Sequence, residues 1–202
     1  MKRLGITLIL AGLMLVACAD PAVDRGLKYL NDYREAPKGE PADPALLDRA
    51  ADQFQQALDR NPNDKVALLN MGLTKREKGD LDGAIADYDK AIEADDGYGK
   101  AWNNRGVAYM TKGDSDTALA SFRKATECED KIPSAHYNRA RLEFEKVKDN
   151  ETALHHADEA IKLEDDKGPY YALRARIHDA MGSADLAAAD RAKAEELGNS
   201  LD

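Results

Sequence analysis

The sequence predicts an all-α fold built from repeated pairs of helices. Alanine recurs in two ladders with a period of 34 residues, lengthened once to 35: Ala50, Ala84, Ala118, Ala153 and Ala187, and Ala57, Ala91, Ala125, Ala160 and Ala194. Self-similarity at such a period is the signature of a repeat protein. Only 3 Phe and 1 Trp occur in 202 residues, which favours helices packed through small side chains over a sheet core.

The composition indicates a folded, acidic protein. Hydrophobic residues make up 43% of the chain and charged residues 33%, which is typical of foldable material. Asp and Glu outnumber Lys and Arg by 38 to 29, for a net charge of −9. Binding to nucleic acid needs a basic surface that neutralises phosphates. We therefore expect no nucleic-acid partner.

The chain begins with a segment typical of an exported protein. Two basic residues, Lys2 and Arg3, precede an apolar run over residues 6–16, and small residues follow. This order is that of a secretory signal. The uncharged stretch 4–19 is shorter than the roughly 20 residues that a membrane-spanning helix needs. We therefore expect residues 1–17 to be a cleaved signal peptide.

Leu15, Val16, Ala17 and Cys18 resemble the lipobox of bacterial lipoproteins. The resemblance implies cleavage before Cys18, a diacylglycerol on its sulfur and usually a third acyl chain on the new amino terminus. Two or more chains hold a protein stably at a membrane. Residues 18–21 would then be the lipidated amino terminus and a short tether. The alternative is an ordinary cleaved signal with an incidental cysteine.

The residue after Cys18 bears on which membrane holds the protein. In lipoproteins of enteric-type Gram-negative bacteria, Asp at that position retains the protein in the inner membrane. Here the residue is Ala19, followed by Asp20. The resemblance therefore favours the outer membrane of a bacterial envelope, facing the periplasm, and leaves the inner or plasma membrane open. If Cys18 is lipidated, Cys128 is expected to be a buried small hydrophobe on an apolar helix face.

The first predicted unit, residues 22–64, is divergent. Residues 22–34 are expected to form its first helix and residues 45–64 its second, with Phe54 as the large residue and Pro62 near the end. Between them lies the proline-rich segment 35–44, EAPKGEPADP. Its prolines cannot continue a helix, so we expect an enlarged surface loop.

Four further units follow, at 65–98, 99–132, 133–167 and 168–197, with a tail at 198–202. The turns inside three of them contain Gly followed by a capping residue: Gly79-Asp80, Gly113-Asp114 and Gly182-Ser183. Gly readily takes the left-handed conformation that ends a helix, and Asp or Ser caps the start of the next. The fourth unit has no Gly in Val147-Lys148-Asp149-Asn150 and one extra residue, which predicts a differently shaped turn.

The pattern of small and large residues resembles the tetratricopeptide repeat. Gly or Ala recurs in the first helix of each unit, Ala recurs seven apart in the second, and the large residues are Tyr88, Trp102, Tyr109 and Phe122. The resemblance covers residues 65–197, and 45–64 as part of an earlier unit. It implies a right-handed superhelical solenoid of about five helix-turn-helix units, each in contact mainly with its neighbours.

In this family the first helices line a concave groove that commonly binds an extended peptide or a partner helix. The resemblance places fourteen residues there: Leu69, Asn70, Leu73, Arg76, Lys100, Asn103, Asn104, Val107, Met110, Tyr137, Asn138, Arg141, Phe144 and Arg176. Cations interleave with apolar side chains in this set. Such a surface suits a segment that carries acidic groups and a few hydrophobic anchors.

The remaining arginines of the first helices are expected to be structural. Arg105, Arg139 and Arg174 each directly precede the small Gly or Ala of their helix. We expect them to pair with acidic residues of adjacent helices, and Asp87 and Asp190 are candidate partners.

No pattern of catalytic residues stands out. His155 and His156 are neighbours on a helix and so do not share a face, and His136 and His178 fall in separate units. A glycine-rich phosphate loop is also missing from the sequence. We therefore expect no enzymatic activity, no cofactor and no metal site.

The sequence thus predicts a lipid-anchored, periplasm-facing adaptor that binds protein or peptide segments through its concave groove. Known lipoproteins of this family serve cell-wall, pilus or secretion, and outer-membrane assembly, and the sequence does not choose among them. The alternative is a scaffold that self-assembles by stacking repeat arrays, which would make the protein a homo-oligomer. An enzymatic role would require an activity that depends on histidine or acidic residues.

Overall fold

A computed structural model describes residues 20–37, 41–128 and 131–198. This part of the chain contains ten α-helices and one π-helical turn, and it contains no strand. The all-α prediction is therefore confirmed. The predicted signal peptide 1–17 and the lipobox residues, Cys18 included, lie outside the described residues.

The helices follow one another as five antiparallel pairs. Their bounds are α1 (Pro21–Arg34) and α2 (Ala45–Arg60), α3 (Lys65–Glu77) and α4 (Leu81–Ala94), α5 (Gly99–Thr111) and α6 (Ser115–Glu127), α7 (Pro133–Leu142) with η1 (Glu143–Val147) and α8 (Asn150–Leu163), and α9 (Gly168–Ala180) and α10 (Ala184–Glu196). Each helix packs against the other member of its pair, and the second helix also packs against the first helix of the next pair.

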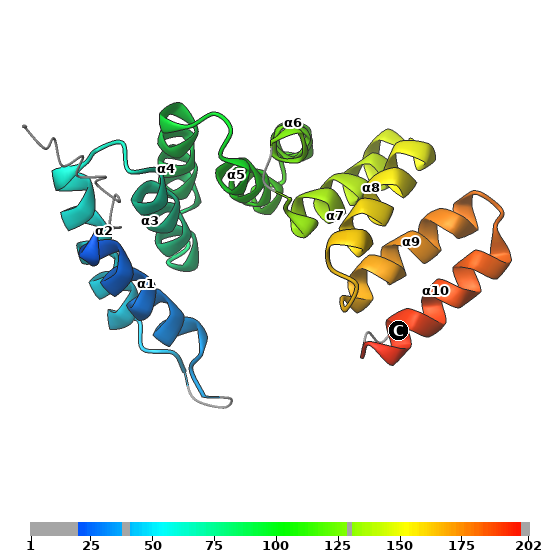
Figure 1. The fold of residues 1–202 in the computed structure, drawn as a ribbon, viewed down its shortest axis with the longest axis horizontal. Helices are drawn as coiled ribbons and strands as arrows, with labels where there is room; N and C mark the ends of the chain where they lie inside the picture. The colour runs from blue at the N-terminus through cyan, green and yellow to red at the C-terminus, as the bar shows by residue number, and fades with distance from the viewer. Residues whose placement is uncertain (1–19, 38–40, 129–130, 199–202) are drawn as a thin grey trace, which may run out of the picture.

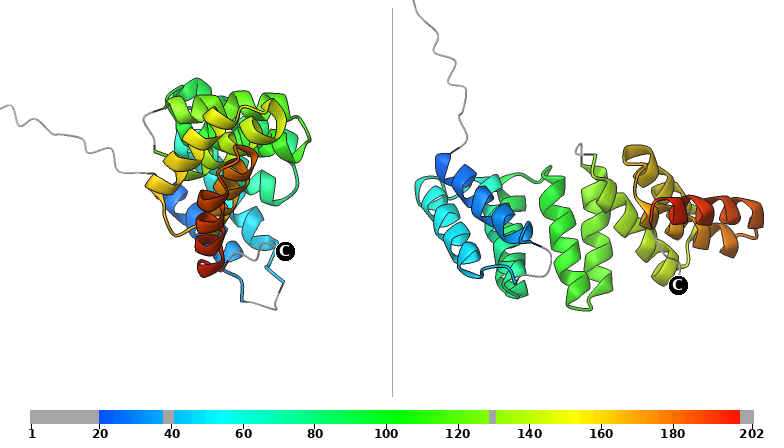
Figure 2. Two further views of the ribbon diagram at one scale, coloured as in Figure 1. Left: turned by 90° about the vertical axis from the view of Figure 1, so that its right-hand side faces the viewer. Right: turned by 90° about the horizontal axis from the view of Figure 1, so that it is seen from below.

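The pairs form an elongated, curved row with α1 at one end and α10 at the other (Figures 1 and 2). This is the layout of a repeat protein whose units touch mainly their neighbours. Within residues 20–37, 41–128 and 131–198, no helix has both the length and the apolar character that crossing a bilayer requires.

The first helix starts earlier than the segment 22–34 that the sequence suggests. Asp20 caps α1 by accepting a hydrogen bond from Ala22 N at 2.8 Å, and Pro21 occupies the first turn, where its missing N–H costs nothing. Asp20 also pairs with Arg60 of α2, at 2.7 Å. Asp20 and Pro21, assigned from sequence to the tether, therefore belong to the start of the helical array.

Glycines end the first helices of three pairs, as predicted. Gly79, Gly113 and Gly182 have φ of 84°, 86° and 76°. The caps that follow are only partly as expected. Asp80 and Asp114 accept hydrogen bonds from the third residue of the next helix. Ser183 makes no side-chain cap to the described residues of α10, and its carbonyl oxygen accepts from Ala187 N instead.

The fourth pair has the differently shaped turn that its sequence predicts. Residues Glu143–Val147 form a π-helical turn after α7, and Lys148 adopts φ of 65° in the place of the missing glycine. A π-turn accommodates one extra residue in a helix. Asp149 then caps α8 by accepting from Thr152 N at 3.0 Å.

Small and large side chains alternate in the core. The ladder alanines are essentially unexposed, and so are three rings: Phe54, Tyr88 and Phe122. Each ring lies against a glycine of the first helix in its own pair, in order Gly26, Gly72 and Gly106. The glycines allow the paired helices to approach closely, as the repeat resemblance implies.

The expectation that Cys128 is buried on an apolar helix face is wrong. Among the large repeat residues, Trp102 is half-buried, and its Nε1 donates to Asp96 O at 2.9 Å. Cys128 is also only half-buried. It follows the last residue of α6 and its Sγ lies 3.2 Å from Lys124 O, so it is not on an apolar helix face.

Candidate functional site

The fourteen residues predicted to bind a ligand lie on α3, α5, α7 with η1, and α9; we call them the first-helix surface. Several touch across successive helices. Arg76 Nη1 donates to Asn104 Oδ1 at 3.2 Å, and Arg141 Nη2 lies 2.8 Å from Met110 Sδ. Asn138 Nδ2 donates to Asn103 Oδ1 at 3.5 Å. The repeat period therefore brings residues that lie far apart in sequence into one strip.

The strip is accessible at ten of its fourteen positions. Four residues are buried: Leu69, Asn70, Asn103 and Asn138. The others are half-buried or exposed: Leu73, Arg76, Lys100, Asn104, Val107, Met110, Tyr137, Arg141, Phe144 and Arg176. A ligand would therefore meet these ten side chains first.

The repeated asparagines use their amide N–H groups within the fold. Asn70 Nδ2 donates to Val66 O and Asn104 Nδ2 donates to Lys100 O, both at 2.8 Å. Each bond joins residues one turn apart on a single helix. These two amides therefore brace the helix, and a ligand backbone would have to compete for them.

Two carboxylates that the sequence analysis did not include lie beside the strip. Arg176 pairs with Glu145 at 3.1 Å, and Glu77 lies 3.3 Å from Arg76 and 3.0 Å from Arg34. The signal was present in the sequence, because Glu77 and Glu145 occupy the same repeat position two periods apart. The charge along the strip therefore alternates rather than being uniformly basic.

The middle of the strip has a different character. Arg141 lies against the sulfur of Met110, and its guanidinium carbon is 5.8 Å from the centre of the Tyr137 ring. At the α9 end of the strip, Arg176, which is paired with Glu145, lies 5.3 Å from the ring centre of Phe144. Cation–π contacts of this kind leave a guanidinium able to donate hydrogen bonds outward. The strip therefore combines aromatic anchors with a cation, Arg141, that a ligand carboxylate could reach.

The structural arginines behave only partly as expected. Arg174 forms the predicted pair with Asp190, with hydrogen bonds of 2.8 and 2.7 Å that raise the pKa of Arg174 above its usual value. Asp87, the other candidate partner, instead lies 2.6 Å from Lys75 of its own pair. Arg105 reaches Asp89 at 2.6 Å. Asp87 belongs to the unit before that of Arg105, whereas Asp190 belongs to the same unit as Arg174, so the two acids are not equivalent partners for these arginines.

A histidine pair joins α7 and α8. His136 Nδ1 lies 3.1 Å from His156 Nδ1, so one ring must donate and the other accept. Burial lowers the pKa of His156 to about 3 and also lowers that of His136. His155 points to the exposed side, as helix geometry predicts. Within residues 20–37, 41–128 and 131–198, no group of three or more His, Cys, Asp or Glu side chains could hold a metal ion.

Comparison with known proteins agrees with this architecture. The sequence model of the tetratricopeptide repeat matches residues 46–99, 69–134 and 104–172. A search of curated protein sequences finds no match.

Solved structures share the fold. A crystal structure of MamA superposes with a TM-score of 0.64 at 19% identity, over 76% of this chain and 90% of MamA. YrrB, described as a TPR protein with an unusual peptide-binding site, gives 0.67 at 23% identity, over 73% of this chain and 75% of YrrB. The pilF protein of Pseudomonas aeruginosa gives 0.74 at 15% identity, over 90% and 77%. At these identities the likeness shows the fold alone.

Proposed function

This chain belongs to the tetratricopeptide repeat family, and we propose that it is a non-enzymatic adaptor that holds bacterial envelope proteins through its first-helix surface. One observation carries the proposal. Accessible apolar residues from successive helices touch cations in a single strip, Met110 against Arg141 and Phe144 against Arg176. Apolar anchors surrounded by charges are typical of protein-binding surfaces.

The charges along the strip indicate where an acidic group of the ligand is expected to bind. Arg76 and Arg176 already have carboxylate neighbours, whereas Arg141 lies against neutral groups and Lys100 is exposed. An acidic group of the ligand is therefore expected to contact the central part, near Lys100 and Arg141. Hydrophobic side chains on either side of that group would pack on Val107 and Phe144.

The proposal places the protein at a membrane through a lipid on Cys18. The lipobox-like residues support this part, and the outer membrane, facing the periplasm, is the favoured location. Asp20 and Pro21 begin the helical array, so only Ala19 would separate the lipidated residue from the folded part. An acidic chain is repelled by anionic lipid headgroups, so the acyl chains would have to supply the attachment.

The second candidate is a scaffold formed by stacked copies of the array. Exposed apolar side chains in the last pair, Met181 and Leu186, favour it. Sedimentation of the detergent-solubilised full chain over a wide concentration range distinguishes the adaptor from the scaffold. Growth into larger species would support the scaffold, and a monomer at every concentration would exclude it.

In-cell crosslinking of the tagged full chain, followed by mass spectrometry, tests the adaptor proposal. The variant replaces Arg76, Arg141 and Arg176 with Glu. A matched control changes charge equally on exposed positions of the second helices: Arg49, Lys124 and Lys162 to Glu. Partners lost from the first variant and kept in the control would support binding by the first-helix surface. Partners unchanged in both would refute it.

A further inference from the structure

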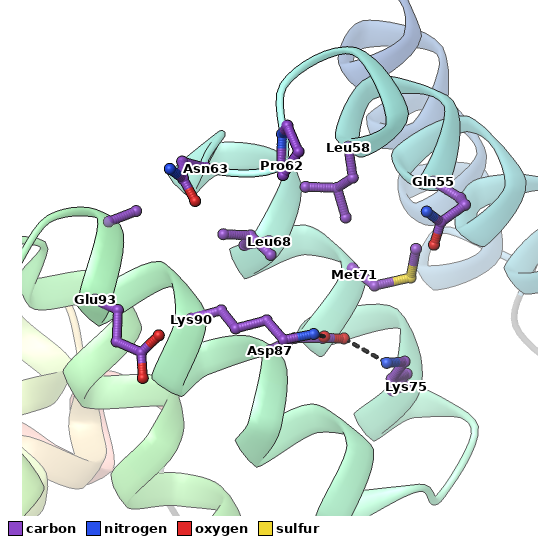
Figure 3. A pocket seen from close by; sticks show the side chains of 11 residues that line it. Gln55, Leu58, Pro62, Asn63, Leu68, Met71, Lys75, Asp87, Lys90 and Glu93 are labelled. Carbon is purple, nitrogen blue, oxygen red and sulfur yellow. Dashed lines mark ion pairs between the residues drawn. The ribbon is translucent and has the colours of Figure 1, made fainter.

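A pocket opens between α2, α3 and α4, separate from the first-helix surface. Its volume is about 750 Å³, and none of the fourteen strip residues lines it. Figure 3 shows Gln55 and Leu58 of α2, Leu68, Met71 and Lys75 of α3, and Asp87 of α4 around it. Asp87 is almost fully buried. The repeat itself shows which group this space fits.

Arginine occupies the place of Met71 in each of the next three units. The period of 34 or 35 residues relates Met71 to Arg105, Arg139 and Arg174. We call the contact between one helix pair and the next a junction, so that Met71, Arg105, Arg139 and Arg174 belong to the first, second, third and last junctions. Two of the arginines, Arg105 and Arg174, bridge the second helices of successive pairs. Arg105 donates to Asp89 Oδ1 of α4 at 2.6 Å and to Ser121 Oγ of α6 at 2.8 Å.

The last junction repeats this bridge with stronger acceptors. Arg174 donates to Asp158 Oδ1 of α8 at 2.7 Å, and it holds both carboxylate oxygens of Asp190 on α10. A bidentate arginine–carboxylate pair is among the strongest hydrogen-bonded contacts in proteins. The space between neighbouring second helices is therefore suited to a guanidinium group.

The first junction keeps the acceptors but lacks the arginine. Gln55 stands at the repeat position of Asp89 and Asp158, and Asp87 stands at that of Ser121 and Asp190. Both Gln55 and Asp87 line the pocket. Met71 is unable to donate to either of them. Two oxygen-bearing side chains at the repeat positions of these acceptors thus line the pocket, together with Lys75 and Lys90. Gln55 Nε2 donates to Asp59 Oδ1 at 2.8 Å, which leaves its carbonyl oxygen as the acceptor.

The side chain at the position of Leu68 is smaller here than in the two units whose arginine bridges second helices. Arg105 lies 5.6 Å from the ring centre of Trp102, and Arg174 lies 5.5 Å from that of Tyr171. Leu68 takes the place of these rings. With Leu68 and Met71 where Trp102 and Arg105 would be, space remains for a side chain that enters from outside.

The third junction shows what happens where the acceptors are missing. Arg123 and His156 stand at the places of Gln55 and Asp87 there. Arg139 turns away, donating to Thr126 Oγ1 at 2.8 Å and lying 3.7 Å from Glu143. The two arginines that lie between second helices thus have oxygen acceptors on both sides, and the equivalent positions between α2 and α4 also carry oxygen atoms.

Asp87 retains capacity to accept a hydrogen bond. Its Oδ2 lies 2.6 Å from Lys75 Nζ and its Oδ1 lies 3.9 Å from Lys90 Nζ, and both lysines line the pocket. No donor among the described residues is aligned with Oδ2 for a hydrogen bond. In the last unit, an arginine and a histidine lie around one carboxylate. There His178, at the repeat position of Lys75, lies 3.9 Å from Asp190 while Arg174 holds both oxygens.

We propose that this pocket is a receptor for an arginine side chain of a partner protein. The guanidinium would donate to Asp87 and Gln55, as Arg174 donates to Asp190 and Asp158 within the chain. The aliphatic part of the side chain would pack on Leu58 and Leu68. This site is independent of the first-helix surface, so the adaptor would have a second contact with its partner.

The proposal is tested by titrating the full chain with a blocked Gly-Arg-Gly peptide. The methyl NMR signals of Leu58, Leu68 and Met71 report binding. Saturable shifts are expected, with half-saturation on the order of 1 mM for so small a probe. Matched peptides with lysine or citrulline in place of arginine should bind at least tenfold more weakly. Equal binding of the three peptides, or no saturable shift, would overturn the proposal.

Three variants locate the binding. Asp87→Asn should weaken peptide binding at least tenfold. Met71→Arg should abolish it by filling the pocket with the residue that the other units hold there, and its helical circular dichroism should remain. Asp89→Asn, a nearby acid of the same helix whose partner is Arg105, should bind as the parent does. Undiminished binding by a folded Met71→Arg chain would contradict the assignment.

Discussion

The ring of Tyr88 lies directly against the backbone of Gly72. A Cβ atom at position 72 would be 2.5 Å from Cε1 of that ring and 3.0 Å from Ala84 O, so rotation of the ring alone could not make room. Gly72→Ala should therefore lower the free energy of unfolding by about 1–2 kcal/mol, because overpacking outweighs the higher helix propensity of alanine. Urea unfolding at equilibrium measures this change.

Gly97→Ala is the matched control. A Cβ there would meet only Asp95 Oδ1, the end of a half-buried side chain, at 3.3 Å and no backbone atom. Its effect should stay within about 0.5 kcal/mol. Equal losses from the two substitutions would show that close helix approach at Gly72 is not what stabilises the pair.

Tyr88→Phe should leave stability unchanged or raise it by about 0.5–1 kcal/mol. The Tyr88 hydroxyl is buried, and burial raises its pKa to about 12. Among the described residues it has no hydrogen-bond partner, a loss that removal of the hydroxyl would relieve. Phe54 and Phe122 already occupy the equivalent places. A destabilisation above about 1 kcal/mol would reveal a partner for the hydroxyl.

Asp190→Ala should be strongly destabilising. Asp190 is buried and holds Arg174 by two hydrogen bonds, so its removal leaves a half-buried guanidinium with fewer acceptors. We expect a loss of about 2–4 kcal/mol in thermal or urea unfolding. Asp82→Ala removes an exposed ion pair with Lys112 and should cost under about 1 kcal/mol. Similar costs for the two would contradict the structural role of Arg174.

The histidine pair should make stability fall in mild acid. The folded chain holds His156 neutral at a pKa of about 3, whereas the unfolded chain binds a proton near pH 6.5. The free energy of unfolding is therefore not lowered by this histidine above pH 6.5, and it falls progressively as the pH drops from 6.5 towards 3. Arg139, His136 and His155 disfavour the charged ring, and Glu159 opposes them.

Urea unfolding at pH 7.5 and pH 5 measures this dependence. His156→Gln should reduce the stability difference between the two pH values by about 2 kcal/mol. His155→Gln, on the exposed side of the same helix, should leave the difference unchanged. An unchanged difference in the His156 variant would rule out the pair as its source.

The helical pairs could be predicted from sequence because local signals determine them. The alanine ladders mark which faces pack, and glycines such as Gly79 and Gly113 mark where one helix ends. The missing glycine near Lys148 predicted an altered turn, but not that a π-helix would form it. That outcome depends on how α7 and α8 pack, which no short stretch of sequence specifies.

The candidate site was only partly predictable. Family geometry assigned the strip residues to the first helices, where they lie, but it did not predict the burial of Asn103 and Asn138 or the pairing of Arg176 with Glu145. These depend on distances between units. The pocket had one sequence signal, which is Met71 at a position where arginine recurs. That Met71 marks a pocket could not be predicted from sequence, because the acceptors Gln55 and Asp87 come from different helix pairs.

Site-specific photo-crosslinking in native cells tests the adaptor role most directly. A photoreactive residue at Val107 samples the middle of the first-helix surface, and one at Lys124 samples the exposed side of α6. We predict that Val107 captures a discrete envelope protein, that Lys124 does not, and that the Arg76, Arg141 and Arg176 to Glu changes remove the product. Capture from Lys124 but not Val107, or none from either, would contradict the proposed function.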